Sequence, residues 1–180
     1  QGGLISPILA NVYLHYVLDL WFEKCIKKQL YGKAYLIRFA DDFLIMFQYE
    51  RDAQRVYEAV IKRMELFGLE LSKEKTRILP FGRNSVSRET FDFLGFTHFN
   101  SKTRKGYYSV GHKISRKKKK QFKSNLKKWV KENRNTQFDE FMEALNKKLT
   151  GSFNYYSLSG MIKEVRNLWQ HSLYVTFKWL

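Results

Sequence analysis

The chain has 180 residues and a formal net charge of +16; 44% of its residues are hydrophobic and 17% are aromatic. The apolar content is ample for a packed core and argues against disorder, and the length suits one domain or one domain with a small second one. The excess of basic residues favours a polyanionic partner, with nucleic acid first and an anionic membrane surface second.

Cysteine usage and hydropathy narrow the cellular setting. Cys25 is the single cysteine, which excludes an intramolecular disulfide framework and a cysteine-based zinc site. No apolar run reaches the roughly 18 uncharged residues of a membrane span, and no signal-peptide pattern is present. We therefore expect no membrane partner and a reducing, cytoplasmic setting, either bacterial or in an organellar matrix. The chain starts at Gln1 without methionine, so we expect it to be part of a longer protein.

The first predicted element is a long helix from Ser6 to about Lys28. Serine is a favoured N-cap and the following proline suits the first helical position. Apolar residues then recur at helical spacing, at Ile8, Leu9, Val12, Tyr16, Val17 and Leu20. The two glycines upstream allow close backbone approach, which suits either a substrate lying along the backbone or a flexible entry turn.

The central motif is Phe39-Ala40-Asp41-Asp42, a short polar link between two apolar runs, 35–37 and 43–47. Aromatic and β-branched runs joined in this way predict a β-hairpin with two adjacent carboxylates at its tip. Such carboxylates repel each other, and one protonates on burial unless a cation lies between them. Their oxygen atoms suit Mg²⁺, whereas the simpler alternative is a solvated turn that happens to contain two aspartates.

An amphipathic helix is predicted from Arg51 to Phe67, with Gly68 as its stop signal. Residues 76–79 and 91–99 are predicted strands, and residues 107–110 are a further candidate. Residues 1–110 therefore predict helices packed on a mostly antiparallel sheet, which is an α+β domain.

The composition changes after about Gly111, because residues 111–180 contain 16 basic and 5 acidic residues. Apolar residues at helical spacing predict three helices there, with residues 151–156 as the link between the second and the third. We expect Trp129 in the core of this basic bundle. For Tyr155 and Tyr156, stacking on bases and packing in the core both remain open.

A basic run begins at the first helix of this bundle. Lysines at a helix N-terminus interact unfavourably with the helix dipole, at a cost of about 0.3–1 kcal/mol each. Binding of phosphates to this face would explain why the lysines are there. A solvated charge run is the alternative. The candidate RNA-contacting residues are Arg116, Lys117, Lys118, Lys119, Lys120, Lys123 and Lys127.

Five stretches of this sequence, taken in order, resemble the reverse transcriptases encoded by group II introns. They are QGGLISPILANVYLHYVLD, IRFADDFLIMF, FGLELSKEKTRI, FDFLGF and KLTGSFNYY, and they span nearly the whole chain. The resemblance implies a right-hand polymerase palm over residues 1–110, with an antiparallel sheet and packed helices. An all-α thumb, the maturase-specific domain, would follow over residues 111–180.

The resemblance also implies the activity and the partners. These are RNA-directed DNA synthesis from an RNA template, a DNA primer and deoxynucleoside triphosphates, together with binding of intron RNA and a maturase role in splicing and mobility. In such enzymes two Mg²⁺ ions on palm carboxylates lower the pKa of the primer 3′-hydroxyl and steady the pyrophosphate leaving group. Asp41 and Asp42 match the family's paired aspartates, so they are the implied metal ligands.

Further residues match other family positions. Lys75 matches the lysine that assists pyrophosphate departure, with Lys73 as a neighbouring alternative. The segment along the incoming nucleotide and template matches Gln1, Gly2 and Gly3. The loop that grips the primer end matches Leu94, Gly95 and Phe96.

The sequence departs from the family pattern in two places. Phe39 stands where many relatives have tyrosine. The family's third metal-binding aspartate lies upstream of the Gln-Gly-Gly turn and is absent here, so we expect these 180 residues alone to bind RNA but to polymerise little. Three other hypotheses remain: a related enzyme recruited to CRISPR adaptation or phage defence, a splicing-only maturase, and a plain nucleic-acid-binding module.

Overall fold

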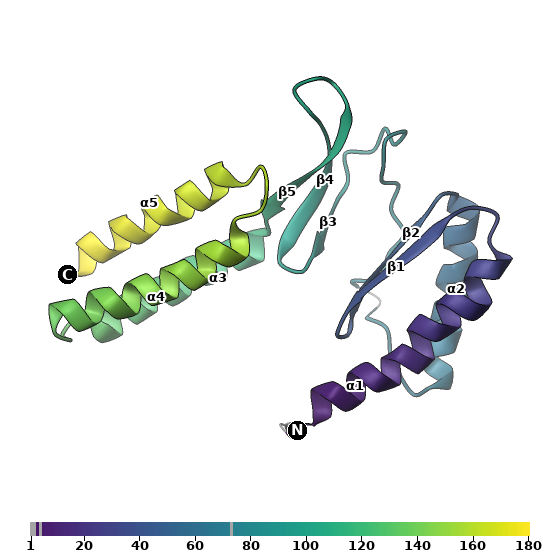
Figure 1. The fold of residues 1–180 in the computed structure, drawn as a ribbon, viewed down its shortest axis with the longest axis horizontal. Helices are drawn as coiled ribbons and strands as arrows, with labels where there is room; N and C mark the ends of the chain where they lie inside the picture. The colour runs from purple at the N-terminus through teal and green to yellow at the C-terminus, as the bar shows by residue number, and fades with distance from the viewer. Residues whose placement is uncertain (1–2, 4, 73) are drawn as a thin grey trace. The chain divides into compact units, whose positions relative to one another are not determined.

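The computed structural model describes residue 3, residues 5–72 and residues 74–180. The chain forms two compact units, residues 1–81 and residues 82–180 (Figure 1). Each unit combines helices with a small antiparallel sheet, so the predicted α+β class is confirmed at this level. The predicted domain boundary, between residues 110 and 111, falls inside a strand of the second unit.

The first unit opens with a continuous helical segment. It comprises the α-helix α1 (Ser6–Leu14), the π-helical turns η1 (His15–Asp19) and η2 (Phe22–Ile26), and the 3-10 turn η3 (Lys27–Gln29). The predicted helix is therefore present, but the predicted serine cap is wrong. Ile5 occupies the N-cap position without a side-chain bond, because Ser6 is already helical and donates its N–H to the carbonyl of Gly3 at 3.1 Å.

The apolar residues of this helical segment divide between core and surface. The segment buries Val17, Leu18 and Phe22, all within or beside the π-helical turns, whereas α1 has no buried residue. A π-turn holds an extra residue and so rotates the side chains that follow it relative to an ideal α-helix. Four members of the predicted apolar stripe are exposed: Ile8, Leu9 and Val12 in α1, ahead of the π-helical turns, and Tyr16 within the first of them.

The predicted hairpin forms from β1 (Ala34–Phe39) and β2 (Asp42–Phe47), which pair antiparallel from Ala34 opposite Phe47 to Phe39 opposite Asp42. The predicted amphipathic helix is α2 (Glu50–Leu66). Gly68, with φ of +66°, terminates it, and the N–H of Leu69 returns to the carbonyl of Met64 at 2.9 Å. One core joins these elements to the first helical segment through Val17, Leu18, Phe22, Ala34, Val56, Val60 and Met64.

One predicted strand of the first unit is wrong. Residues 76–79 lie outside any strand, and the chain there has extended or irregular backbone. A strand requires a paired neighbour, and the sheet of this unit contains only β1 and β2 among the described residues.

The second unit contains a three-stranded sheet in the order β3-β4-β5 and a three-helix bundle. The strands are β3 (Thr90–Phe93), β4 (Phe96–Lys102) and β5 (Tyr108–Ile114). The predicted single strand over 91–99 is thus two strands. Leu94 and Gly95 have φ of +50° and +82° and reverse the chain between them.

The predicted bundle is confirmed as α3 (Arg116–Asn133), α4 (Phe138–Tyr156) and α5 (Ile162–Trp179). Its core contains Leu126, Val130, Phe141, Leu145 and Val175, and Trp129 packs against this cluster as expected. The predicted link over 151–156 is wrong, because α4 continues through it to Tyr156. Trp169 and Leu173, two of the apolar residues at helical spacing in α5, are exposed.

Candidate functional site

Asp41 and Asp42 lie at the two-residue turn between β1 and β2. Phe39 and Asp42 form the last cross-strand pair, which leaves Ala40 and Asp41 as the central turn residues. Ala40 has φ of +54°, and it is the first of the two, as in a type II′ turn. Both aspartates are exposed, so either carboxylate can meet a ligand from solvent.

The left-handed conformation of Ala40 is strained. A residue with a Cβ atom loses roughly 1–2 kcal/mol there, because Cβ approaches the following carbonyl oxygen. Such conformations persist only when surrounding contacts hold them, and they concentrate at functional sites. The contacts that hold this one come from Arg38.

Arg38 connects the turn to the helical segment before it. Its Nη1 donates to the carbonyl oxygen of Ala40 at 2.8 Å and to Oδ1 of Asn11 at 2.9 Å. Its Nε and Nη2 donate to the two carboxylate oxygens of Asp19 at 2.8 and 2.7 Å. The guanidinium thereby uses donors on three sides, and the turn next to Asp41 is fixed to the helical segment at two points.

The ion pair of Arg38 with Asp19 is mostly shielded, with 12% of the arginine and 25% of the aspartate side chain exposed. The hydrogen bonds from Arg38 hold the pKa of Asp19 below its ordinary value, against the opposing effect of burial; a bond to His15 adds to the lowering. The same bonds raise the pKa of Arg38. Both groups therefore stay charged at neutral pH.

Sequence reasoning missed Arg38, Asp19 and Asn11, although one signal was available. Side chains alternate between the two faces of a strand, so Arg38 lies on the same face as Ala34 and Leu36, which pack in the core. A charged residue at an inward strand position requires a partner, because an unpaired buried charge is strongly unfavourable.

The carboxylates of Asp41 and Asp42 have the hard oxygen donors that Mg²⁺ prefers, and the turn holds them side by side. They account for only part of a full ligand set. Over residues 3, 5–72 and 74–180, no group of three or more histidine, cysteine, aspartate or glutamate side chains is placed to hold a metal ion. The nearby carboxylate of Asp19 is already engaged by Arg38.

Other predicted residues of the first unit are described only in part. Gln1, Gly2 and Lys73 lie outside the described residues. Gly3 is exposed, and its carbonyl oxygen accepts a hydrogen bond from the N–H of Ser6, the first residue of α1. Lys75 is exposed in a turn after α2, where its N–H donates to the carbonyl of Ser72 at 3.1 Å.

The Leu94-Gly95 turn joins β3 to β4, with Phe93 and Phe96 as the flanking cross-strand pair. Positive φ at both central residues defines a type I′ turn, which favours glycine or asparagine over leucine. The carbonyl oxygen of Leu94 accepts a hydrogen bond from the Tyr155 hydroxyl at 2.8 Å. The carbonyl oxygen of Gly95 accepts one from the N–H of Ser115 at 3.0 Å.

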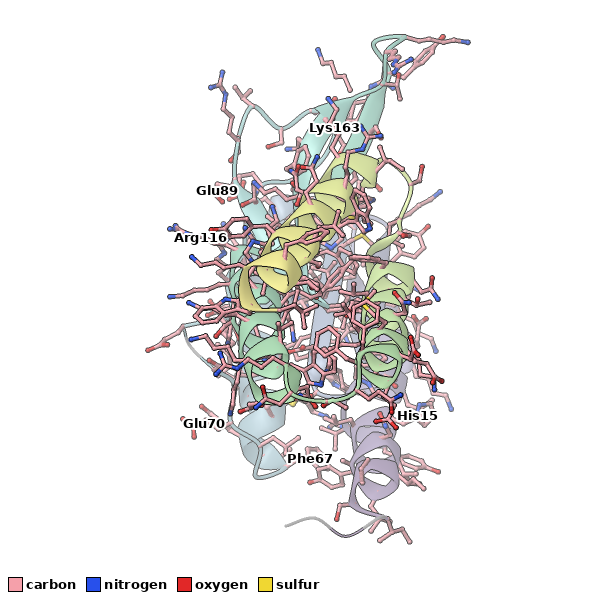
Figure 2. All side chains as sticks on the ribbon, turned by 90° about the vertical axis from the view of Figure 1, so that its left-hand side faces the viewer. His15, Phe67, Glu70, Glu89, Arg116 and Lys163 are labelled. Carbon is pink, nitrogen blue, oxygen red and sulfur yellow. The ribbon has the colours of Figure 1, made fainter. Side chains whose placement is uncertain are left out.

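The predicted basic run lies on α3. Lys119 is half-buried and pairs with Glu164 of α5 at 2.5 Å, so one of its predicted members is committed to an internal ion pair. The other six are exposed: Arg116, Lys117, Lys118, Lys120, Lys123 and Lys127. Among them, the side chain of Arg116 points away from the bundle (Figure 2). This leaves a positive surface that suits phosphate contacts.

A search for a membrane-crossing helix among the described residues found none of sufficient length and apolarity.

Comparison with known protein families gives two matches. Residues 1–98 match the family model described as reverse transcriptase (RNA-dependent DNA polymerase). Residues 119–180 match the family model described as group II intron, maturase-specific domain. A search of curated proteins found no significant match.

Proposed function

The chain belongs to the reverse transcriptase family, with a group II intron maturase-specific domain in its second half, and from this premise we propose that the β1–β2 turn is its polymerase site. The two matches together identify a group II intron-encoded reverse transcriptase and maturase, whose partners are nucleic acids, intron RNA among them. They favour neither recruitment to CRISPR adaptation or phage defence nor a splicing-only role.

We propose that Asp41 and Asp42 hold Mg²⁺ for phosphoryl transfer. The observation that carries this assignment is the pair of exposed, adjacent carboxylates on a strained turn that Arg38 fixes in place. When bound, Mg²⁺ activates the primer 3′-hydroxyl and stabilises the departing pyrophosphate. A third oxygen-donating side chain from outside the described residues completes the set, as the family pattern implies.

Other residues bind and orient the substrates in this proposal. The exposed ammonium of Lys75 neutralises negative charge on the pyrophosphate. The backbone at Gly3, together with Gln1 and Gly2, lies along the incoming deoxynucleotide and the template. Leu94, Gly95 and Phe96 hold the primer end. In this proposal, residues 1–110 are the palm and residues 111–180 are the thumb. The exposed basic residues of α3 contact the RNA backbone.

The test uses the complete intron-encoded protein and measures extension of a DNA primer on an RNA template with Mg²⁺. Asp41→Ala should reduce DNA synthesis to background, while RNA affinity stays within about twofold of wild type because an exposed carboxylate contributes little to phosphate binding. The matched control is Glu70→Gln, which removes one exposed carboxylate from the same unit and should leave synthesis unchanged. Near-normal extension by the Asp41→Ala protein refutes the assignment.

A further inference from the structure

We propose that Tyr155 is a positioning residue for the primer: its hydroxyl holds the Leu94-Gly95 turn in shape and thereby couples the maturase-specific helices to primer alignment. This inference rests on the proposed role of Leu94, Gly95 and Phe96 as the primer-gripping loop. It also assigns a role to Tyr155, for which the sequence left base stacking and core packing open.

The turn needs external support because of its own sequence. A type I′ turn requires φ > 0 at both central residues, and leucine at the first of them meets the steric penalty that glycine avoids. Leu94 nevertheless adopts φ of +50°. Without external support, the backbone at Leu94 would relax toward a more favourable conformation, and the side chains of the loop would move as well.

Two hydrogen bonds supply this support, one to each carbonyl of the turn. Ser115, which caps α3, donates its N–H to Gly95, and Tyr155, near the end of α4, donates its hydroxyl to Leu94. The Ser115 bond comes from the junction of β5 and α3, which is continuous with the sheet itself. The Tyr155 bond joins residues 61 positions apart and is the one that depends on the packing of α4.

The surroundings of Tyr155 favour positioning over core filling. Its side chain is 54% exposed, whereas the adjacent Tyr156 is 8% exposed and belongs to the core. The Tyr155 ring stacks on Phe96 with centroids 5.6 Å apart and planes 25° apart, so it also braces the third residue of the loop. Stacking on Phe96 therefore orients the Tyr155 ring so that its hydroxyl reaches the carbonyl of Leu94.

The charge beside the turn suits a primer backbone. A Cβ atom on Gly95 would lie 3.4 Å from Cγ of Lys118, so the lysine stem runs directly beside this glycine. Lys118 is exposed, and its ammonium can meet a phosphate that approaches the turn. A turn held by Tyr155 would thus present its backbone and one cation in a constant geometry.

The experiment compares Tyr155→Phe with wild type in the complete protein. The variant keeps the ring and removes only the hydroxyl. We expect kcat/KM for the primer–template to fall between about twofold and about tenfold, the range of one hydrogen bond. KM for the deoxynucleotide should stay unchanged, and the melting temperature should fall by a few degrees at most. Amide exchange over residues 91–99 should become faster.

Tyr156→Phe is the matched control. It removes a hydroxyl one residue away, from a ring that packs on the same Phe96 at 5.8 Å, and should change none of these quantities. An unchanged kcat/KM for the primer–template in Tyr155→Phe overturns the proposal. So does a parallel loss of melting temperature and of both substrate parameters, which indicates a general structural role.

Failure of the proposed function gives a different result. If the wild-type protein extends no primer, the polymerase assignment fails by itself. Exchange over residues 91–99 then still decides the structural step, since an unchanged rate in Tyr155→Phe shows that the hydroxyl does not hold the turn.

Discussion

Arg38 and Asp19 form a bidentate ion pair, with N–O distances of 2.8 and 2.7 Å, that fastens the strand before the aspartate turn to the end of η1. The remaining Nη1 of the arginine donates to the carbonyl of Ala40 inside that turn. The pair therefore transmits the position of the helical segment to the residue beside Asp41. The contribution of this ion pair to the free energy of unfolding, and the pH range over which it contributes, can both be tested.

Arg38→Ala should lower the free energy of unfolding by about 2–4 kcal/mol, because it leaves the shielded Asp19 carboxylate without its main partner. Arg38→Lys should recover only part of this loss, since an ammonium cannot donate in the planar, bidentate geometry of a guanidinium. Equilibrium urea unfolding measures both. Arg55→Lys is the control: Arg55 is exposed, and its hydrogen bonds to Gln29 are long, at 3.3 and 3.5 Å. A comparable loss there would contradict the special role of Arg38.

The same pair sets an acid limit. The pKa of Asp19 is lower in the folded chain than in the unfolded chain, so its stabilising contribution is complete above the ordinary carboxylate pKa of about 3.9 and disappears as the pH falls through the lowered folded value. Urea unfolding at a series of pH values should show wild type losing its advantage over Asp19→Asn below about pH 4. An advantage that stays constant from pH 7 to pH 3 would show that Asp19 does not titrate in this way.

Ala40→Gly should stabilise the folded chain by about 0.5–1 kcal/mol. Glycine removes the penalty of φ at +54°, roughly 1–2 kcal/mol, and part of that gain is offset by the greater freedom of glycine in the unfolded chain. Ala10→Gly, at an exposed site in α1, has only the second effect and should destabilise by about 1 kcal/mol. The two substitutions are chemically identical, so equal signs in thermal or urea unfolding would refute the strain at Ala40.

RNA affinity should depend strongly on salt and on the exposed lysines of α3. Raising salt from about 50 to about 200 mM should weaken binding by orders of magnitude if many lysines neutralise phosphates. Replacing Lys117, Lys118 and Lys120 together by glutamine should reduce the slope of log K against log salt by about 2–3. Lys119→Gln should change the slope by less than a third of that amount, because Lys119 pairs with Glu164. Fluorescence anisotropy over a salt series measures the slope for wild type and for both variants.

The 180-residue chain by itself should bind RNA yet extend a primer little or not at all. Its described residues hold no group of three metal-binding side chains, so a palm built from them lacks a complete ligand set for two metal ions. A primer-extension assay with Mg²⁺ and deoxynucleotides, run beside an RNA-binding measurement on the same preparation, tests this. Efficient extension by the purified chain would show that Asp41 and Asp42 suffice.

Much of the fold could be predicted because its signals are local. Periodicity located α2 and the three helices of the bundle, and the apolar runs on either side of Asp41-Asp42 located the first hairpin. These patterns depend on residues within one or two turns of a helix or along one strand, and packing does not reverse them. The family could likewise be predicted from the sequence, because five stretches occur in the order that is typical of group II intron reverse transcriptases.

Local signals failed where the backbone or a polar side chain depends on distant contacts. The strand predicted over 91–99 is broken at Leu94, whose left-handed conformation no propensity favours and a hydroxyl 61 residues away helps to hold. The partner of Arg38 lies 19 residues upstream, across the helix–hairpin junction. Apolar periodicity alone also did not show that α1 leaves its apolar residues exposed.

The sequence by itself therefore determined the family, the first hairpin, α2 and the three helices of the bundle. Only the tertiary structure decided what holds the Ala40-Asp41 turn and the Leu94-Gly95 turn. The physical reason is that each turn contains a residue in an unfavourable conformation, Ala40 in one and Leu94 in the other. Such conformations exist only by virtue of hydrogen bonds from Arg38, Ser115 and Tyr155, which the folded chain brings to them.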